Sequence, residues 1–109
     1  HGKQLAAALA DFPALKDWLE GLPNADHSAL LYQGGAAWRM RIADDLGTSV
    51  DAFLAAHDDD QLARLMSDLG GHCMATLVEA FADCSDDVPT LFVAWTVKGF
   101  GLPFAGHKD

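Results

Sequence analysis

The clearest chemistry in this chain lies near its C-terminus, where Lys98 and Gly99 follow an apolar run from Leu91 to Val97. A run without a polar face is typical of a strand that is buried on both faces of a parallel sheet. Such sheets bind ligands beyond the carboxyl ends of their strands. The pattern therefore predicts that Lys98 approaches a ligand, and the alternative is a solvent-exposed lysine at a strand end.

Two histidines next to glycines are further candidates. His107 lies in the segment Gly106–Asp109 (Gly106, His107, Lys108 and Asp109), which is typical of an active-site loop that orders when substrate binds. For the isolated chain we favour the alternative, an exposed histidine near the end of the sequence. His72 follows Gly70 and Gly71, where it either lies near a ligand pocket or satisfies backbone groups in a tight turn.

Acidic and sulfur-containing residues suggest no metal site. The run from Asp58 to Asp60 and the neighbouring His57 are interpreted as one helix boundary, because carboxylates are favourable at a helix N-terminus. Cys73 and Cys84 are predicted to lie on one helix about 16 Å apart, well beyond the reach of a disulfide. Neither cysteine has a partner at the Cys-x-x-Cys spacing typical of zinc ligands.

The elements that must position these residues are mostly helices. Trp38, Ile42 and Leu46 recur at helical spacing, Asp58 and Gln61 have the spacing of a capping box, and the apolar residues of 74–81 form a further helical stripe. The predicted fold is an α/β fragment: short helices followed by one buried parallel-type strand over about residues 90–97. Trp38, Phe81, Phe92 and Trp95 are predicted to belong to the core.

The domain organisation follows from that single strand. A parallel strand needs parallel neighbours, and only one strand is recognisable, so we expect a piece of a larger α/β domain. Residues 1–69 are predicted to form a helical insertion or covering layer. Residues 70–109 are predicted to form a loop, a helix, the strand and a loop at the ligand edge.

Composition excludes several classes of partner. The 109 residues carry a formal charge of −9, and half of them are hydrophobic. The acidic balance argues against nucleic acid and against an anionic membrane surface. No apolar run approaches the roughly 20 residues of a membrane span. Reduced cysteines favour the cytoplasm.

Three stretches together resemble a known enzyme family. They are LLYQGGAAWR at 30–39, LGGH at 69–72, and TVKGFG at 96–101 followed by AGHKD at 105–109. The chain resembles the thiamine-diphosphate-dependent decarboxylating component of pyruvate dehydrogenase, of the single-chain homodimeric bacterial type, and more widely the transketolase superfamily. The resemblance covers essentially the whole chain but only a small part of such an enzyme, at the end of its diphosphate-binding domain.

The resemblance implies an activity and its partners. The parent enzyme decarboxylates pyruvate with thiamine diphosphate and Mg²⁺ and passes the acetyl group to a lipoyl carrier. It implies that Lys98, Gly99 and His72 lie near the cofactor and that 106–109 belong to the active-site loop. The implied partners are the remainder of the enzyme, a second copy in a homodimer, and the lipoyl acyltransferase component.

The chain departs from the family pattern in two places. Cys73 stands where the family usually has Asp, whose carboxylate would cap the following helix. The Gly-Asp-Gly segment and following Asn that hold the cofactor and Mg²⁺ in the superfamily are absent. The chain alone is therefore expected to be inactive and not to bind the cofactor tightly.

Two alternatives remain. Within the same class, transketolase or another 2-oxo-acid dehydrogenase is the nearest. From a different class, a small acidic helical protein-interaction module would account for the apolar surface that a lone strand leaves exposed.

Overall fold

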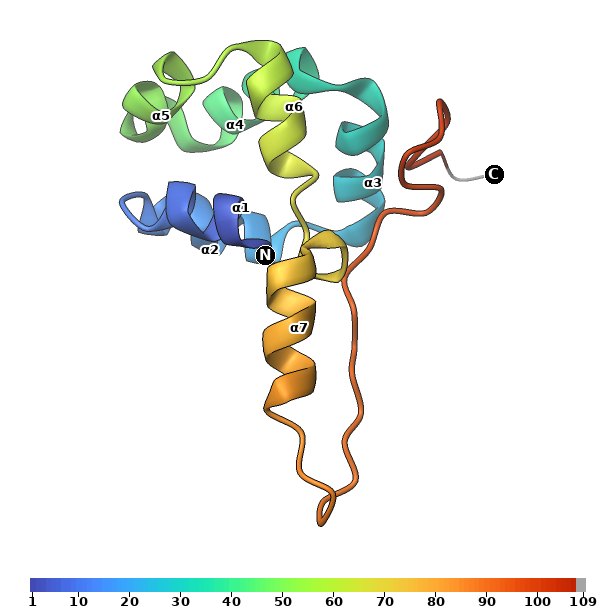
Figure 1. Ribbon diagram of the computed structural model, residues 1–109. Coiled ribbons are helices and arrows are strands. Elements are labelled where there is room, and N and C mark those ends of the chain that lie inside the picture. The colour runs from blue at the N-terminus through green and yellow to red at the C-terminus, as the bar shows by residue number, and fades with distance from the viewer. Residues whose placement is uncertain (108–109) are drawn as a thin grey trace.

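The computed structural model describes residues 1–107, in which every regular element is a helix (Figure 1). In chain order the elements are α1 (Lys3–Leu9), α2 (Pro13–Gly21), α3 (Asn24–Gln33), α4 (Gly35–Leu46), the 3₁₀ helix η1 (Gly47–Val50), α5 (Asp51–Ala55), α6 (Asp59–Met66), the 3₁₀ helix η2 (Gly70–His72) and α7 (Met74–Ala82). The prediction of short helices over the first two-thirds is confirmed. None of these helices has the length and apolarity that crossing a bilayer requires.

The hydrophobic core lies among α1 to α6. Helix α4 is central, since it packs against α2, α3, η1 and α6. Trp38 and Ile42 of α4 are fully buried, as their helical spacing predicts, and Phe53 of α5 and Met66 of α6 lie in the same core. Apart from Val97, every buried apolar side chain in the described chain belongs to residues 5–69.

A close backbone approach joins α4 to the start of α6. A Cβ atom on Gly35 would lie 1.8 Å from the carbonyl oxygen of Asp59, so a glycine is required there. One turn later, Arg39 donates from Nε to Asp59 Oδ1 at 2.7 Å and from a terminal nitrogen to the carbonyl oxygen of Leu54 at 2.8 Å. This contact fixes the loop between α5 and α6 against α4.

The acidic run at 58–60 is a helix N-terminus, as predicted. Asp58 is the N-cap of α6 and accepts from the Gln61 amide at 2.7 Å, while the Gln61 side chain accepts from the Asp58 amide at 2.9 Å. Within residues 1–107 no group of three His, Cys, Asp or Glu side chains could hold a metal ion.

The remaining part of the chain forms a projecting arm. Helix α7 points away from the core helices, and the chain then turns and returns alongside it as an extended segment that reaches α3 (Figure 1). We call residues 74–95 the apolar arm, because its large side chains are mostly exposed: Met74, Val78, Phe81, Val88, Leu91, Phe92, Val93 and Trp95.

The predicted α/β fold with a buried strand over residues 90–97 is wrong. The segment is extended, but Leu91 is 88% and Val93 is 91% exposed. A strand exists only as part of a hydrogen-bonded ladder, and no second extended segment pairs with this one in the described chain. Within residues 91–96 only the Trp95 carbonyl joins a backbone hydrogen bond to another described residue.

The predicted core was also too large. Trp38 is buried, but Phe81 and Phe92 are exposed and Trp95 is 36% exposed. The rings of Phe81 and Phe92 instead contact each other across the arm, with centroids 4.7 Å apart. The helical spacing in α7 is correct, but its apolar stripe finds no described element to cover it.

Candidate functional site

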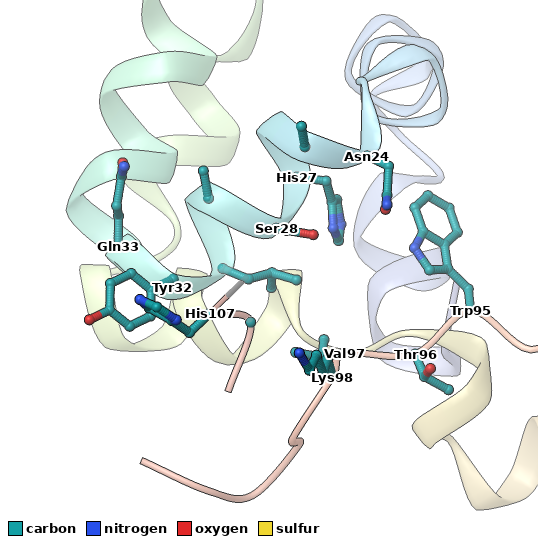
Figure 2. Close-up of a pocket in the computed structure, with 14 residues that line it drawn as sticks. Asn24, His27, Ser28, Tyr32, Gln33, Trp95, Thr96, Val97, Lys98 and His107 are labelled. Atoms are coloured by element: carbon teal, nitrogen blue, oxygen red, sulfur yellow. The ribbon is translucent and has the colours of Figure 1, made fainter. Parts of the chain in front are cut away.

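A pocket of about 630 Å³ lies between α3 and the returning segment 95–107 (Figure 2). Helix α3 supplies one wall with Asn24, His27, Ser28 and Tyr32, and the returning segment supplies the other. The volume is in the range of small-molecule sites. The pocket thus joins residues that are about 70 positions apart in the sequence.

The returning segment is held in place by the Gly70–His72 turn. The Gly71 amide donates to the Trp95 carbonyl at 3.0 Å, and a Cβ atom on Gly71 would lie 2.6 Å from that oxygen. The Val97 amide donates to His72 Nε2 at 2.7 Å, and the His72 ring stacks on Phe100 with centroids 3.9 Å apart. These contacts position Val97 and Lys98 at the pocket.

Two glycines shape the loop that follows. Gly99 has φ +69° and Gly106 has φ +82°, a region that L side chains rarely adopt. The Gly106 amide donates to the Lys98 carbonyl at 2.9 Å and closes the loop. Gly106 also lies against α3, since a Cβ atom there would be 3.4 Å from the Ser28 carbonyl oxygen.

His27 is the most unusual polar group at the pocket. The residue is only 2% exposed, and its Nε2 is buried without a hydrogen-bond partner in the described chain. Its ring centroid lies 5.2 Å from that of Trp95 and 5.5 Å from that of Trp38. Burial lowers the pKa of His27, because the low-dielectric surroundings disfavour the charged imidazolium. At neutral pH the pocket therefore contains a neutral imidazole.

The structure brings some of the predicted site residues together. Lys98, Gly106 and His107 all line the pocket, and the His107 ring contacts Tyr32 edge to face with centroids 5.1 Å apart. Gly99 forms the turn after Lys98 but is not part of the lining. Lys108 and Asp109 lie outside the described residues.

His72 occupies a supporting position. It does not line the pocket, and its Nε2 accepts the Val97 amide, so the structure matches the backbone-satisfying role given above as one alternative. Because Nε2 accepts, the neutral His72 ring carries its proton on Nδ1.

Cys73 begins α7 without a conventional cap. It holds the N-cap position with an extended backbone, and its side chain makes no capping hydrogen bond of ordinary geometry. Even so, the Thr76 hydroxyl and the amides of Lys3 and Thr76 are placed to stabilise the thiolate, which lowers the pKa of the Cys73 thiol. Both cysteines are free thiols.

Sequence reasoning missed His27 and assigned Trp95 to the core. A histidine inside the helical sequence NADHSALLYQ carries no local signal of its role. The informative signal is that His27, Leu30 and Leu31 lie at i, i+3 and i+4, because this spacing places the histidine on the inward side of its helix.

The described residues do not fit Mg²⁺ and a diphosphate group by themselves. They contain no group of three metal-ligating side chains, and Lys98 is the single lysine or arginine in the pocket lining. The carboxylates of Asp26 and Asp45 are both bonded to Arg41, at 3.1 and 2.8 Å. The described residues therefore form a pocket wall in which no metal-ligating group is found.

Comparisons of the chain with protein-family profiles, curated proteins and solved structures gave no significant match.

Proposed function

We propose that this chain is a segment of a thiamine-diphosphate-dependent pyruvate dehydrogenase component of the acetyl-transferring type. In the proposed enzyme, pyruvate is decarboxylated and the acetyl group passes to a lipoyl carrier. The remainder of the enzyme holds the cofactor and Mg²⁺, and this chain supplies one wall of the reactant site. The proposed setting is a cytoplasmic homodimer that works with a lipoyl acyltransferase.

One observation carries the proposal: the separate motifs behind the resemblance meet in space. The Gly71 amide bonds to Trp95, His72 holds Val97, and His72 stacks on Phe100. Residues 73–95, 23 residues in all, separate Gly-Gly-His from Thr-Val-Lys-Gly-Phe-Gly, so local sequence gives the two motifs no reason to touch. Their contact places Lys98 and His107 at one pocket, which supports a shared role for the motifs.

A chimeric enzyme tests this proposal. Residues 1–109 would replace the corresponding segment of a homodimeric pyruvate dehydrogenase, and CO₂ release from labelled pyruvate and acetyl transfer to a lipoyl domain would be measured. We expect the chimera to retain both activities and the isolated chain to have neither. A chimera that folds and dimerises but has no activity would contradict the proposal.

Lys98→Met in the chimera examines the predicted role of that residue. Losing a hydrogen bond to a charged group costs about 1.5–3 kcal/mol, so kcat/KM should fall by about tenfold or more. Lys16→Met is the matched control, since Lys16 is exposed on α2. Equal kcat/KM values in the two variants would show that Lys98 contributes no more to catalysis than the exposed Lys16.

A protein-interaction module is the second candidate, and the apolar arm favours it. Leu91 and Val93 are almost fully exposed, and further large apolar side chains of the arm are exposed as well. Exposed patches of this kind mark surfaces that bind other proteins. The interaction module would be favoured over the enzyme if the chimera folds without activity and the isolated chain is a monodisperse monomer.

A further inference from the structure

Two hydrogen bonds to the backbone of the returning segment tie it to the Gly70–His72 turn. The Trp95 carbonyl accepts from the Gly71 amide at 3.0 Å, and the Val97 amide donates to His72 Nε2 at 2.7 Å. Loss of either bond would leave the segment with one such tie to the turn among the described residues. The attachment of this pocket wall therefore depends on both partners in the turn.

The bond to His72 differs from the other because it depends on protonation. A neutral imidazole that carries its proton on Nδ1 accepts at Nε2, whereas an imidazolium carries hydrogens on both nitrogens and accepts at neither. Protonation would therefore make the Val97 amide and Nε2 two donors that face each other. Imidazole is the side chain that ordinarily gains a proton between about pH 5 and 8.

Val97 is the point at which release of the segment matters most. It is only 8% exposed, and a buried N–H that loses its acceptor is more costly than one that water can reach. Its carbonyl accepts from the Phe100 amide at 3.1 Å, and its neighbours Trp95, Thr96 and Lys98 line the pocket with it. Release of Val97 would therefore move one wall of the pocket (Figure 2).

The surroundings of the His72 ring allow it to become charged. The residue is partly exposed, and its ring stacks on Phe100 with centroids 3.9 Å apart and planes 14° from parallel. The face of an aromatic ring attracts a cation, so an imidazolium can stay stacked on Phe100. Protonation then removes the acceptor of the Val97 amide without expelling the ring from its place.

No described salt bridge fixes the protonation state of His72. The titratable and charged side chains on the elements around the turn are those of His1, Lys3, Arg64, Asp68, Cys73 and Lys98. Lys3 bonds to Glu79 at 2.6 Å, and Asp68 accepts from the Leu5 amide at 2.9 Å. Within residues 1–107 no ion pair joins His72 to any of these groups.

We propose that His72 is a pH-sensitive latch on the pocket wall. The neutral imidazole holds Val97 and keeps the returning segment on the turn, and the imidazolium releases it as the pH falls. The latch is built from residues 70–72 and 95–100 of this chain. It does not depend on the proposed pyruvate dehydrogenase function, so a failure of either leaves the other standing.

Amide hydrogen exchange at Val97 tests the latch. The rate at each pH would be divided by that of an unfolded chain and compared with the Leu62 amide of the core, which donates to the Asp58 carbonyl at 2.8 Å. We expect the relative protection of Val97 to fall about tenfold from about pH 7.5 to about pH 5.5, the usual effect of losing one hydrogen bond. The midpoint should equal that of the His72 ring in an NMR titration. Constant protection, or a different midpoint, would overturn the proposal.

Two substitutions separate the acceptor from the ring. His72→Gln keeps a side-chain acceptor that does not titrate, so Val97 should be equally protected at both pH values. His72→Phe keeps a flat ring without an acceptor, so the protection should be low at both. His57→Gln is the matched control and should retain the fall, since the His57 ring packs on Phe53 in the core. A fall that persists in His72→Gln would refute the latch. Should the His72 variants not fold, the shared midpoint in the unsubstituted chain decides.

Discussion

Replacing Gly71 by alanine should detach the returning segment from the Gly70–His72 turn. A Cβ atom at position 71 would lie 2.5 Å from Thr96 Cγ2 and 2.6 Å from the Trp95 carbonyl oxygen. The methyl group of Thr96 can rotate away, but the carbonyl belongs to the backbone and the segment must move with it. Gly71 does not have positive φ, so its backbone conformation adds no strain.

The magnitude of this effect follows from those contacts. Overpacking costs about 1–3 kcal/mol, and losing the 3.0 Å bond from the Gly71 amide to Trp95 adds about 0.5–1.5 kcal/mol. The smaller entropy of alanine in the unfolded chain offsets about 0.4–1 kcal/mol. We expect a net loss of about 1–3 kcal/mol that falls mainly on the segment, because Val97 is its single contribution to the buried apolar side chains of the described chain.

The assay must therefore separate local from global stability. Amide hydrogen exchange should show faster exchange at Val97, whose amide is held by His72, while urea unfolding of the core helices stays nearly unchanged. Gly21→Ala is the matched control, because nothing lies within 4 Å of its Cβ position. Unchanged exchange at Val97 in Gly71→Ala, or the same change in Gly21→Ala, would refute the reasoning.

Three further predictions concern other parts of the chain. Burial lowers the pKa of His27, so below about pH 6.5 the unfolded chain binds a proton that the folded chain does not. The free energy of unfolding should therefore fall with decreasing pH by up to about 1.4 kcal/mol per unit from this group, and His27→Phe should flatten that fall in urea titrations. Cys73 should react faster with iodoacetamide than Cys84 at neutral pH, measured by mass spectrometry, because its thiol pKa is lowered; equal rates would contradict this. The chain should self-associate through the apolar arm in sedimentation experiments, and Val93→Lys should weaken the association; a monodisperse unsubstituted chain would contradict this.

The helices could be predicted because their signals are local. The capping box of Asp58 and Gln61 and the stripe of Trp38 and Ile42 lie within one or two turns, and the structure contains both. Such patterns can be recognised from neighbouring residues alone, whatever lies elsewhere in the chain. The apolar stripe of α7 is equally local and predicted its helix, but it could not reveal that no described element covers that helix.

The strand could not be predicted because pairing is not a local property. The run from Leu91 to Val97 has the composition of a buried strand, yet a strand requires a neighbour to take its backbone hydrogen bonds. In the described chain only the end of the run finds one, at the Gly71 amide and the His72 ring. Composition thus predicted the extended conformation and mispredicted both the sheet and the burial.

Lys98 and His107 both line the pocket, but for a physical reason that sequence reasoning did not give. Sequence reasoning placed Lys98 at the edge of a sheet, but the structure places it by contacts at two glycines. Gly71 lets the segment approach the turn before α7, and Gly106 lets the loop close on the Lys98 carbonyl and lie against α3. Glycine spacing marks close backbone approaches whether or not a sheet is present. For this reason the glycine motifs were better guides to the site than the apolar run between them.

The pocket and the apolar arm can be tested separately. The pocket between α3 and residues 95–107 is lined by described residues of this chain, so ligand binding there can be measured on the chain itself. The apolar arm is different, because Leu91 and Val93 are almost fully exposed and, of the backbone groups of residues 91–95, only the Trp95 carbonyl joins a described hydrogen bond. Exposed extended segments of this kind tend to pair with another chain or segment. If the proposed enzyme is correct, its remainder covers the arm, and the chimera should form its homodimer without the further association through the arm that we expect of the isolated chain, while keeping the pocket. A chimera whose arm still self-associates would show that this surface serves a different partner.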